Sequence, residues 1–514
     1  MHDRPSPDLV PLPEWVSVHP QALAVARGEA ESAATAGPRP PRSRALATAL
    51  AAANRAWGNE VDSELSRWLA GAEVVVTGQQ PGLLGGPLLS LVKACAVAAE
   101  VRRRHAAGRE AVGFFWLATA DDDLPEMGWA RVAAGDQVLA AREDGWSRGA
   151  ETAASARLSG ACAGLLDAVG ERVPSEHARA ALDHAARCYP PGAALGDATA
   201  RFLAPLLAGL GIVIVDACEE EVARAGSIPV VRVLERLPEA WAALEAGADT
   251  MRQRGWSVPL HLAKAKLPVF RRVDGRREGI ATRGGACPAP VLEELTAHPE
   301  RFLPNAWLRP VLQDGALDTA VSMLGGAELA YHAQAREIWA LAGIGRAEWR
   351  LRPHVTVVTA AERRLAAQLG LAPADLLHDR LPRRLLPGSG VRKNLHATAV
   401  VIERRLKALE AQAAGELPAL RADVEATRTR LLGGLQWLEE RLEGTAARTA
   451  EVEMTRWRKL RAFLRPDGKP QERHLSVLAP LLRLGLDWPR RLADAIDPTN
   501  PGMHLLHWSE GGSW

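Results

Sequence analysis

The stretch EVVVTGQQPGLLGGPLLSLVKACAVAAE, residues 73–100, decides the fold of this chain. Its apolar run at 74–76 consists of β-branched residues, which is typical of a strand covered on both faces by helices. Several glycines follow and free the backbone to take positive φ angles, and Pro87 suits the first turn of a helix that we expect to reach about Arg104. Strand, turn and helix in this order predict the first unit of an α/β sheet.

The turn within this stretch is a candidate binding site. Amides at a helix start and the positive end of the helix dipole attract phosphate or carboxylate groups. The spacing matches neither GxGxxG nor GxxxxGK[ST], so a plain structural turn without a ligand remains open. Lys93, on the predicted helix, is either a further anion contact or a solvated lysine. The substrate-binding residues that we predict here are Thr77, Gly78, Gln79, Gln80, Gly82, Gly86 and Pro87.

Two more apolar runs predict further strands, AVGFFWLATADDD from Ala111 and GIVIVDAC from Gly211. Helical stretches separate the three runs, which indicates a parallel sheet with right-handed crossovers. Ligands of such sheets bind beyond the carboxyl ends of the strands, where Thr77, Asp121 and Asp216 lie. We therefore predict an α/β fold with its site at that edge.

Three adjacent carboxylates, Asp121, Asp122 and Asp123, end the second of these strands and are the predicted catalytic residues. Neighbouring acids repel one another, and an ammonium group or Mg²⁺ would relieve the repulsion. Successive strand residues point to opposite faces, so at most two of the three can line one pocket. A solvated acidic loop is the alternative interpretation.

Composition excludes several classes of protein. The chain has 514 residues, 47% of them hydrophobic and 24% charged, as in globular proteins, and its net charge of +2 favours neither a nucleic acid nor a membrane as partner. Its five cysteines lack any CxxC pair and indicate reduced thiols rather than disulfides or metal ligands. The amino-terminal residues lack the apolar core of a signal peptide and no run is long enough to span a membrane, so we expect a cytoplasmic protein.

The pattern changes from about Val391 to Leu460, where charged residues become dense and apolar residues recur in steps of three, four and seven between Leu406 and Leu442. This spacing is typical of a coiled coil. Pro418 indicates a break or a fresh helix start within it. A solvated helical pair packed on its own core is the alternative.

Five segments carry a resemblance to a known family. The TGQQPGLLGGPL segment at residues 77–88 resembles a signature of the bacillithiol biosynthesis cysteine ligase family, BshC. Four more segments follow in the order of that family: FFWLATADDDLPEM from Phe114, PNAWLRPVLQD from Pro304, GGAELAYHAQ from Gly325 and RPDGKPQERHL from Arg465. The resemblance implies a Rossmann-like core related to class I synthetases and nucleotidylyl transferases, and a carboxyl-terminal coiled coil through which subunits form a homodimer.

The same resemblance implies a ligase that joins L-cysteine to glucosaminyl malate through an amide bond. The expected cofactor is a nucleotide, ATP or ADP; whether ATP is consumed and whether Mg²⁺ is required both stay open. A nucleotide-accepting pocket in the carboxyl-terminal region is implied, for which we name Gln471, Glu472 and Arg473. The alternatives are a nucleotide-dependent ligase with a different amino acid or amine, and a dimeric binding protein with impaired catalysis.

Polar residues near the third and fourth segments complete the predicted substrate site. The forked Arg309 guanidinium suits the malate carboxylates, with Asn305 and Gln313 as neutral donors, unless Arg309 forms a structural ion pair. Glu328 and Tyr331 follow at helical spacing, although Glu328 would also favour a helix start. His332 we interpret as a packing or surface residue.

The chain departs from its family at several positions. Ala120 and Asp122 stand where the family has glutamate and histidine, and an aspartate removes a proton from an amine less readily than a histidine does. Asp318 replaces a proline, and Gly326 replaces the proline of a Gly-Pro pair. The predicted organisation is a helical lead-in at 1–70, a core at 71–385 with insertions at about 140–205 and 235–300, a coiled coil at 386–464, and a segment at 465–514 that packs back on the core.

Overall fold

The computed structural model describes residues 8–13, 16, 18–149, 151–173, 175–377, 389–449 and 451–508. Two compact units divide the chain: Met1–Ala360 together with Lys469–Trp514, and Ala361–Gly468. The first unit thus consists of two segments from the two ends of the sequence, while the second unit is one continuous segment between them.

A five-stranded parallel sheet forms the centre of the first unit, in the order β11-β10-β2-β3-β6. Its strands are β2 (Glu73–Gln79), β3 (Ala111–Leu117), β6 (Ile212–Asp216), β10 (Thr319–Leu324) and β11 (Glu348–Leu351). The three strands predicted from apolar runs are β2, β3 and β6, so the expected parallel α/β core is confirmed. The sequence analysis did not identify β10 and β11.

The order in which strands are added to this sheet reverses beside β2. After β2 it adds β3 and β6 on one side, and then returns to add β10 and β11 on the other. The carboxyl ends of β2 and β10 therefore form a topological switch point, which is where open α/β sheets leave a crevice for a ligand.

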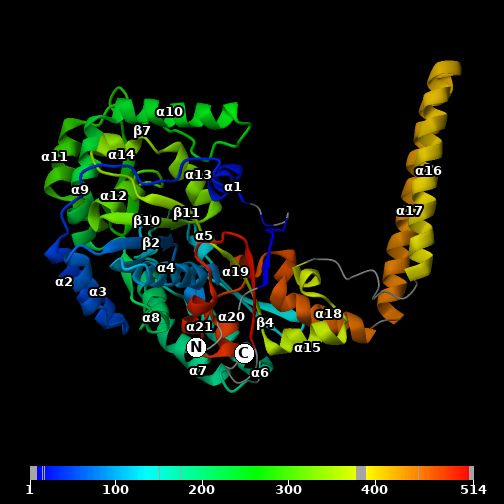
Figure 1. Cartoon of the computed structure of the whole chain (residues 1–514), viewed down its shortest axis with the longest axis horizontal. Helices are drawn as coiled ribbons and strands as arrows, with labels where there is room; N and C mark the ends of the chain where they lie inside the picture. The colour runs from blue at the N-terminus through cyan, green and yellow to red at the C-terminus, as the bar shows by residue number, and fades with distance from the viewer. Residues whose placement is uncertain are drawn as a thin grey trace. The chain divides into compact units, whose positions relative to one another are not determined.

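Helices cover both faces of the sheet. On one face lies α4 (Leu89–Ala106), directly after β2 and beside it (Figure 1). Gly113 of β3 allows this close approach, because a Cβ atom there would lie 2.9 Å from Cγ1 of Val97 on α4. The other face packs on α2 (Arg44–Trp57) and α3 (Asp62–Leu69), whose Trp68 meets Phe114 edge to face.

Further elements of the first unit surround this core. Helices between β3 and β6 are α5 (Leu124–Met127), α6 (Ala161–Arg172), α7 (Ala178–Cys188) and α8 (Leu195–Leu207), with a hairpin of β4 (Trp129–Ala134) and β5 (Gln137–Arg142). Between β6 and β10 lie α9 (Glu220–Glu235), α10 (Leu237–Gln253), α11 (Ala289–Ala297) and α12 (Arg309–Leu317), with an antiparallel sheet of β7 (Lys266–Val273), β8 (Arg276–Ala281) and β9 (Phe302–Pro304). The others are α1 (Pro20–Ala26), α13 (Gly326–Gln334) and α14 (Ile338–Ala342).

The carboxyl-terminal segment packs against α4 and builds a second sheet. It contains α19 (Gln471–His474), α20 (Leu478–Leu484), α21 (Trp488–Ala495) and β13 (Met503–His507), and β13 pairs with β1 (Asp8–Val10) and β12 (His354–Val358). The Cys95 thiol of α4 lies 3.4 Å from the Pro489 carbonyl of α21.

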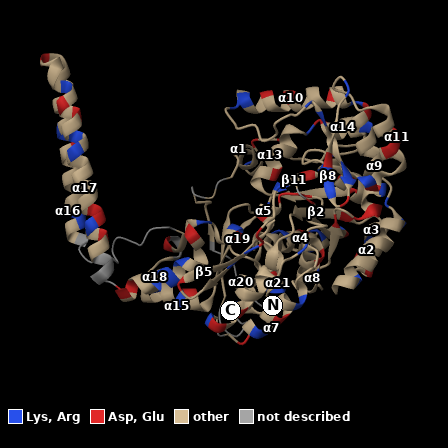
Figure 2. Ribbon diagram, turned by 180° about the vertical axis from the view of Figure 1, so that it is seen from behind, with Lys and Arg blue, Asp and Glu red and all other residues tan. Residues whose placement is uncertain are grey.

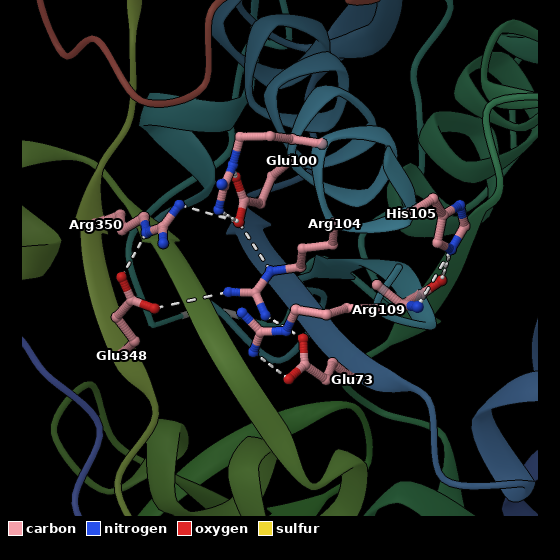
Figure 3. A network of polar contacts seen from close by, with 9 residues as sticks. Glu73, Glu100, Arg104, His105, Arg109, Glu348 and Arg350 are labelled. Carbon is pink, nitrogen blue, oxygen red and sulfur yellow. Dashed lines mark hydrogen bonds and ion pairs between the residues drawn. The ribbon is translucent and has the colours of Figure 1, made fainter. Parts of the chain in front are cut away.

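A network of ion pairs holds the last turns of α4 near the amino-terminal ends of the strands, at the edge of the sheet opposite to the switch point (Figure 3). The fully buried Glu100 carboxylate accepts from Arg103 and Arg104 of its own helix and pairs with Arg350 of β11 at 3.0 Å. Arg104 also pairs with Glu73 at the start of β2. The network ties the last turn of α4 to two strands, and its basic residues suit the negative end of the helix dipole.

The second unit is helical. It contains α15 (Ala360–Gln368), α16 (Ser389–Glu416), α17 (Arg421–Thr449) and α18 (Glu451–Leu464). The long helices α16 and α17 run antiparallel side by side (Figure 1), with an ion pair between Arg392 and Glu443 at 3.0 Å. The predicted break is confirmed, because a 3₁₀ turn that begins at Pro418 separates the two helices. Residues of both charge signs intersperse along them (Figure 2).

Candidate functional site

A cavity of about 670 Å³ lies at the switch point of the sheet. Its wall combines the carboxyl ends of β2, β3, β10 and β11 with residues from β7, β8, α4, α10, α12, α13 and α19. Of the residues predicted from sequence, those that line it are Gly78, Gln79, Gln80, Asp121, Asn305, Arg309, Glu328, Tyr331 and Arg473. The others, Thr77, Gly82, Gly86, Pro87, Asp122, Asp123, Gln313, Gln471 and Glu472, are not part of its lining.

The end of β2 enters the cavity, but the glycine turn behind it does not. Thr77 is buried and its hydroxyl donates to the Met323 carbonyl at 2.8 Å, which ties β2 to β10. The Gly82 amide donates to Thr199 and the Gly85 amide to Tyr189, at 3.2 and 2.7 Å. The expectation that this turn presents its amides to a ligand is therefore corrected.

The remaining turn residues bond within the protein as well. The Gly86 amide donates to the Leu83 carbonyl. A 3₁₀ turn precedes α4, which begins at Leu89 rather than at Pro87. Turn and helix start are consequently structural, and the first predicted role of Gly82, Gly86 and Pro87, binding an anion, has no geometric support.

Lys93 is buried rather than solvated, with 3% of its side chain exposed, and it lines the cavity. Its ammonium group donates to the Gly78 carbonyl at 2.7 Å and to the Glu328 carboxylate at 2.6 Å. Burial lowers the pKa of Lys93, and the Glu328 carboxylate opposes this effect. For Glu328 burial would raise the pKa, but Lys93 and the Gly325 amide outweigh it, so the net pKa is lowered. The two groups therefore form a buried ion pair between α4 and α13.

The three aspartates after β3 are separated by arginines. Asp122 pairs with Arg277 of β8 at 2.8 Å, and Asp123 pairs with Arg148. Only Asp121 reaches the cavity, where Gln80 donates to its carboxylate. The cations that relieve the repulsion at Asp122 and Asp123 are thus guanidinium groups of the protein, and the catalytic role of these two residues stays a prediction that the geometry does not favour.

Arg309 lies at the start of α12 and faces the cavity. Its guanidinium donates to the Gln313 side chain at 3.2 Å and to the Tyr331 hydroxyl at 3.0 Å. Gln313 is buried behind it, so it orients the arginine instead of lining the cavity. The Asn305 side chain accepts from the amides of Trp307 and Leu308, in the turn before α12. Within the described ranges no carboxylate lies within ion-pair distance of Arg309, so its charge is available to a ligand.

His332, next to Tyr331, is a packing residue as predicted. It is buried between the rings of Tyr331, Trp339 and Trp349, at centroid distances of 5.0 to 5.8 Å. Burial lowers its pKa to about 3, so the imidazole is neutral at physiological pH.

Gln471 and Glu472 hold α19 against β12 instead of facing a ligand. The Gln471 side chain exchanges hydrogen bonds with the backbone of Val357, at 2.7 and 3.0 Å. Buried Glu472 accepts from Arg352 at 2.6 and 3.0 Å and from His354 at 3.0 Å. Both carboxylate oxygens of Glu472 thus have partners within the protein and neither residue lines the cavity, so their nucleotide contacts stay a prediction that this geometry does not favour. Arg473 is exposed and lines the cavity.

The cavity is cationic on balance. Its lining includes Lys93, Lys266, Arg277, Arg309, Arg352 and Arg473, but only two carboxylates, Asp121 and Glu328. Lys93, Arg277 and Arg352 each have an acidic partner. Lys266, Arg309 and Arg473 have none among the residues that the structure describes. Lys266, Arg277 and Arg352 were not predicted from the sequence, because no local motif marks them.

An aromatic wall faces part of this polar lining. Trp241 and Trp307 meet edge to face at 5.6 Å, and Phe270 lies 4.4 Å from the Arg277 guanidinium. In the described part of the chain no cluster of three His, Cys, Asp or Glu residues has the arrangement of a metal site. The described helices also include none with the length and apolarity to cross a membrane.

Two family models match the chain over most of its length. They describe "Bacillithiol biosynthesis BshC, N-terminal Rossmann-like domain", which matches residues 28–347, and "Bacillithiol biosynthesis BshC, C-terminal coiled-coil domain", which matches residues 389–508.

Curated relatives carry the name "Putative cysteine ligase BshC". The protein of Symbiobacterium thermophilum is 28% identical over 88% of this chain and 87% of its own. The protein of Salinibacter ruber is 27% identical over 87% of this chain and 86% of its own. A protein of Thermus thermophilus is 31% identical over 85% and 88%.

Proposed function

The chain belongs to the BshC family of bacillithiol biosynthesis, and from this premise we propose that it is a cysteine ligase. The reaction joins the carboxyl group of L-cysteine to the amine of glucosaminyl malate and forms the amide bond of bacillithiol. The name of the relatives supports this assignment, and the alternative ligase and the impaired binding protein gain no support from them.

The observation that carries the proposal is the Arg309 guanidinium at the switch point. It faces a cavity of about 670 Å³, and its hydrogen-bond partners among the described residues are the neutral side chains of Gln313 and Tyr331. A partly buried cation that has no acidic partner is stabilised when an anionic ligand binds. Glucosaminyl malate has two carboxylates, and Arg473 on α19 offers a second cation on the same cavity. We therefore assign the malate group to Arg309 and Arg473.

Amide formation from a free carboxylate requires activation, for which we propose ATP as a co-substrate. Of the residues first named for a nucleotide, Gln471 and Glu472 bond within the protein, which does not favour a nucleotide contact for them, whereas Arg473 lines the cavity. Lys266 is the cavity cation left for phosphate groups, and Asp121 and Glu328 are the carboxylates of the cavity lining that Mg²⁺ would take as ligands.

Product analysis tests the ligase proposal directly. We would incubate the purified protein with L-cysteine and glucosaminyl malate, with and without ATP and Mg²⁺, and detect bacillithiol by mass spectrometry. Protein-dependent product is expected, and its dependence on ATP decides the activation step. Absence of product from folded protein and verified substrates would contradict the assignment.

Substitution of Arg309 tests the malate contact. Charge-assisted hydrogen bonds contribute about 1.5–3 kcal/mol, so Arg309→Gln is expected to raise KM for glucosaminyl malate about 10- to 100-fold. KM for L-cysteine should change little. Arg179→Gln, at an exposed position of α7, is the matched control. Equal effects on both substrates, or no effect, would remove Arg309 from this role.

We also propose that the protein forms a homodimer through α16 and α17. Large apolar side chains are about half exposed on these helices and the turn between them, namely Val400, Leu409, Leu417, Leu431, Trp437 and Leu438. Exposed apolar residues on a helical hairpin favour a partner surface. Light scattering should show a dimer that Trp437→Glu weakens, whereas Thr429→Glu, at an exposed polar position of α17, leaves it intact. A wild-type monomer would contradict the proposal.

We place the reaction in the cytoplasm, which the free thiols of all five cysteines support.

A further inference from the structure

Glu328 stands out in the cavity because the two oxygens of its carboxylate have different surroundings. Oε2 accepts from the Lys93 ammonium group at 2.6 Å and from the Gly325 amide at 2.8 Å. These two hydrogen bonds to Oε2 fix the orientation of the Glu328 side chain. Oε1 is not buried and has no partner among the described residues, and Glu328 lines the cavity, so Oε1 is the oxygen that a ligand can reach.

The charge of Glu328 contrasts with the rest of the lining. The unpaired cations of the cavity, Lys266, Arg309 and Arg473, attract anionic groups and repel an ammonium group. The other carboxylate, Asp121, already accepts from Gln80 and from the Asp122 amide. Glu328 is therefore the acceptor best placed to receive a positively charged donor from a ligand.

We infer that Glu328 Oε1 binds the primary ammonium group of an amine substrate in this cavity. The inference rests on the proposed function, which supplies two such groups: the α-ammonium of L-cysteine and the 2-ammonium of glucosaminyl malate. Both present the same chemistry to a carboxylate. An ammonium group bound there is held on the wall between β2 and β10, while the malate or carboxyl end of the ligand meets the arginines.

Lys93 matters to the design of the test. In Glu328→Gln alone, its buried ammonium group loses its counter-ion and would itself repel a cationic ligand. The double variant Lys93→Met with Glu328→Gln removes both charges as a pair and leaves the net charge of the wall unchanged. A loss of ammonium binding in the double variant then reports the missing carboxylate.

Binding by isothermal titration calorimetry separates the two sources of the ammonium group. Each substrate is paired with its deaminated counterpart: L-cysteine with 3-mercaptopropionate, and glucosaminyl malate with glucosyl malate. For one of the two pairs, wild-type protein should bind the amine more tightly than its counterpart. The double variant should weaken the amine about tenfold or more, and bind the counterpart as wild type does.

Other outcomes overturn the inference. Equal losses for an amine and its counterpart would show a general disturbance of the cavity, which circular dichroism and thermal melting of the variants would also detect. An unchanged preference for the amine in the double variant would exclude Glu328 as its acceptor, while wild-type binding of both substrates would leave the proposed function standing. Failure of wild-type protein to bind either substrate would overturn the proposed function and this inference together.

Discussion

Replacement of Glu472 by glutamine removes the buried carboxylate that holds the carboxyl-terminal segment on the core. Glu472 accepts two hydrogen bonds from Arg352, one from His354 and one from the Val355 amide, at 2.6 to 3.1 Å. Arg352 is fully buried, so the substitution leaves its guanidinium without a counter-ion. Breaking a buried pair in this way costs about 3–5 kcal/mol of unfolding free energy.

Urea-induced unfolding, followed by tryptophan fluorescence, measures this cost. With an m-value of about 3 kcal/mol/M, the midpoint of Glu472→Gln should fall by about 1 M or more. The matched control is Glu171→Gln, at an exposed position of α6, which should stay within about 0.5 kcal/mol of wild type. A loss below about 1 kcal/mol for Glu472→Gln would refute the reasoning that this pair anchors α19.

The pH dependence of the same difference follows from the pKa of Glu472. Burial raises it, but Arg352 and His354 outweigh burial, so the pKa lies well below its usual range. A lowered pKa in the folded state contributes stability that is present above the unfolded pKa of about 4.3. The difference between wild type and Glu472→Gln should therefore hold from pH 7 to 5 and shrink as the pH falls below about 4.

Three further predictions concern the first unit. Gly226→Ala should lower the free energy of unfolding in urea by about 2 kcal/mol or more, because a Cβ atom there would lie 2.4 Å from the Leu312 carbonyl oxygen of α12. An unchanged unfolding midpoint would contradict this packing. As the pH falls from 6.5 to 3, the free energy of unfolding should decrease less for His332→Phe than for wild type. The reason is that the wild-type imidazole, whose pKa is lowered to about 3 in the folded state, binds a proton only on unfolding. The same pH dependence of the unfolding free energy in both proteins would contradict this prediction. Iodoacetamide at pH 7 should modify the thiols of the folded protein slowly and those of the urea-unfolded protein rapidly. Iodoacetamide reacts with the thiolate, and burial raises the pKa of the Cys287 thiol, for example, to about 11. Rapid labelling of the folded protein would contradict this prediction.

The sequence predicted much of the core because its signals are local. The β-branched run at 74–76, the runs that became β3 and β6, and the helix break at Pro418 each depend on neighbouring residues. It missed β10 and β11, since Ser322 interrupts the apolar run of β10 and the charged Glu348 and Arg350 alternate with apolar residues in β11. The resemblance to BshC, carried by five ordered motifs, was sufficient to name the family.

Tertiary structure alone decided which polar residues share the cavity. Lys93 meets Glu328, Asp122 meets Arg277 and Glu472 meets Arg352 across 235, 155 and 120 positions of sequence. No periodicity encodes such pairs, because they form only when the sheet order brings distant segments together. By itself the sequence determined three strands of the five-stranded core sheet, the helix break at Pro418 and the family. Only the folded chain decided that the glycine turn bonds internally and that the cavity presents Arg309, Arg473 and Glu328, because each buried donor or charge had to find its partner within the protein.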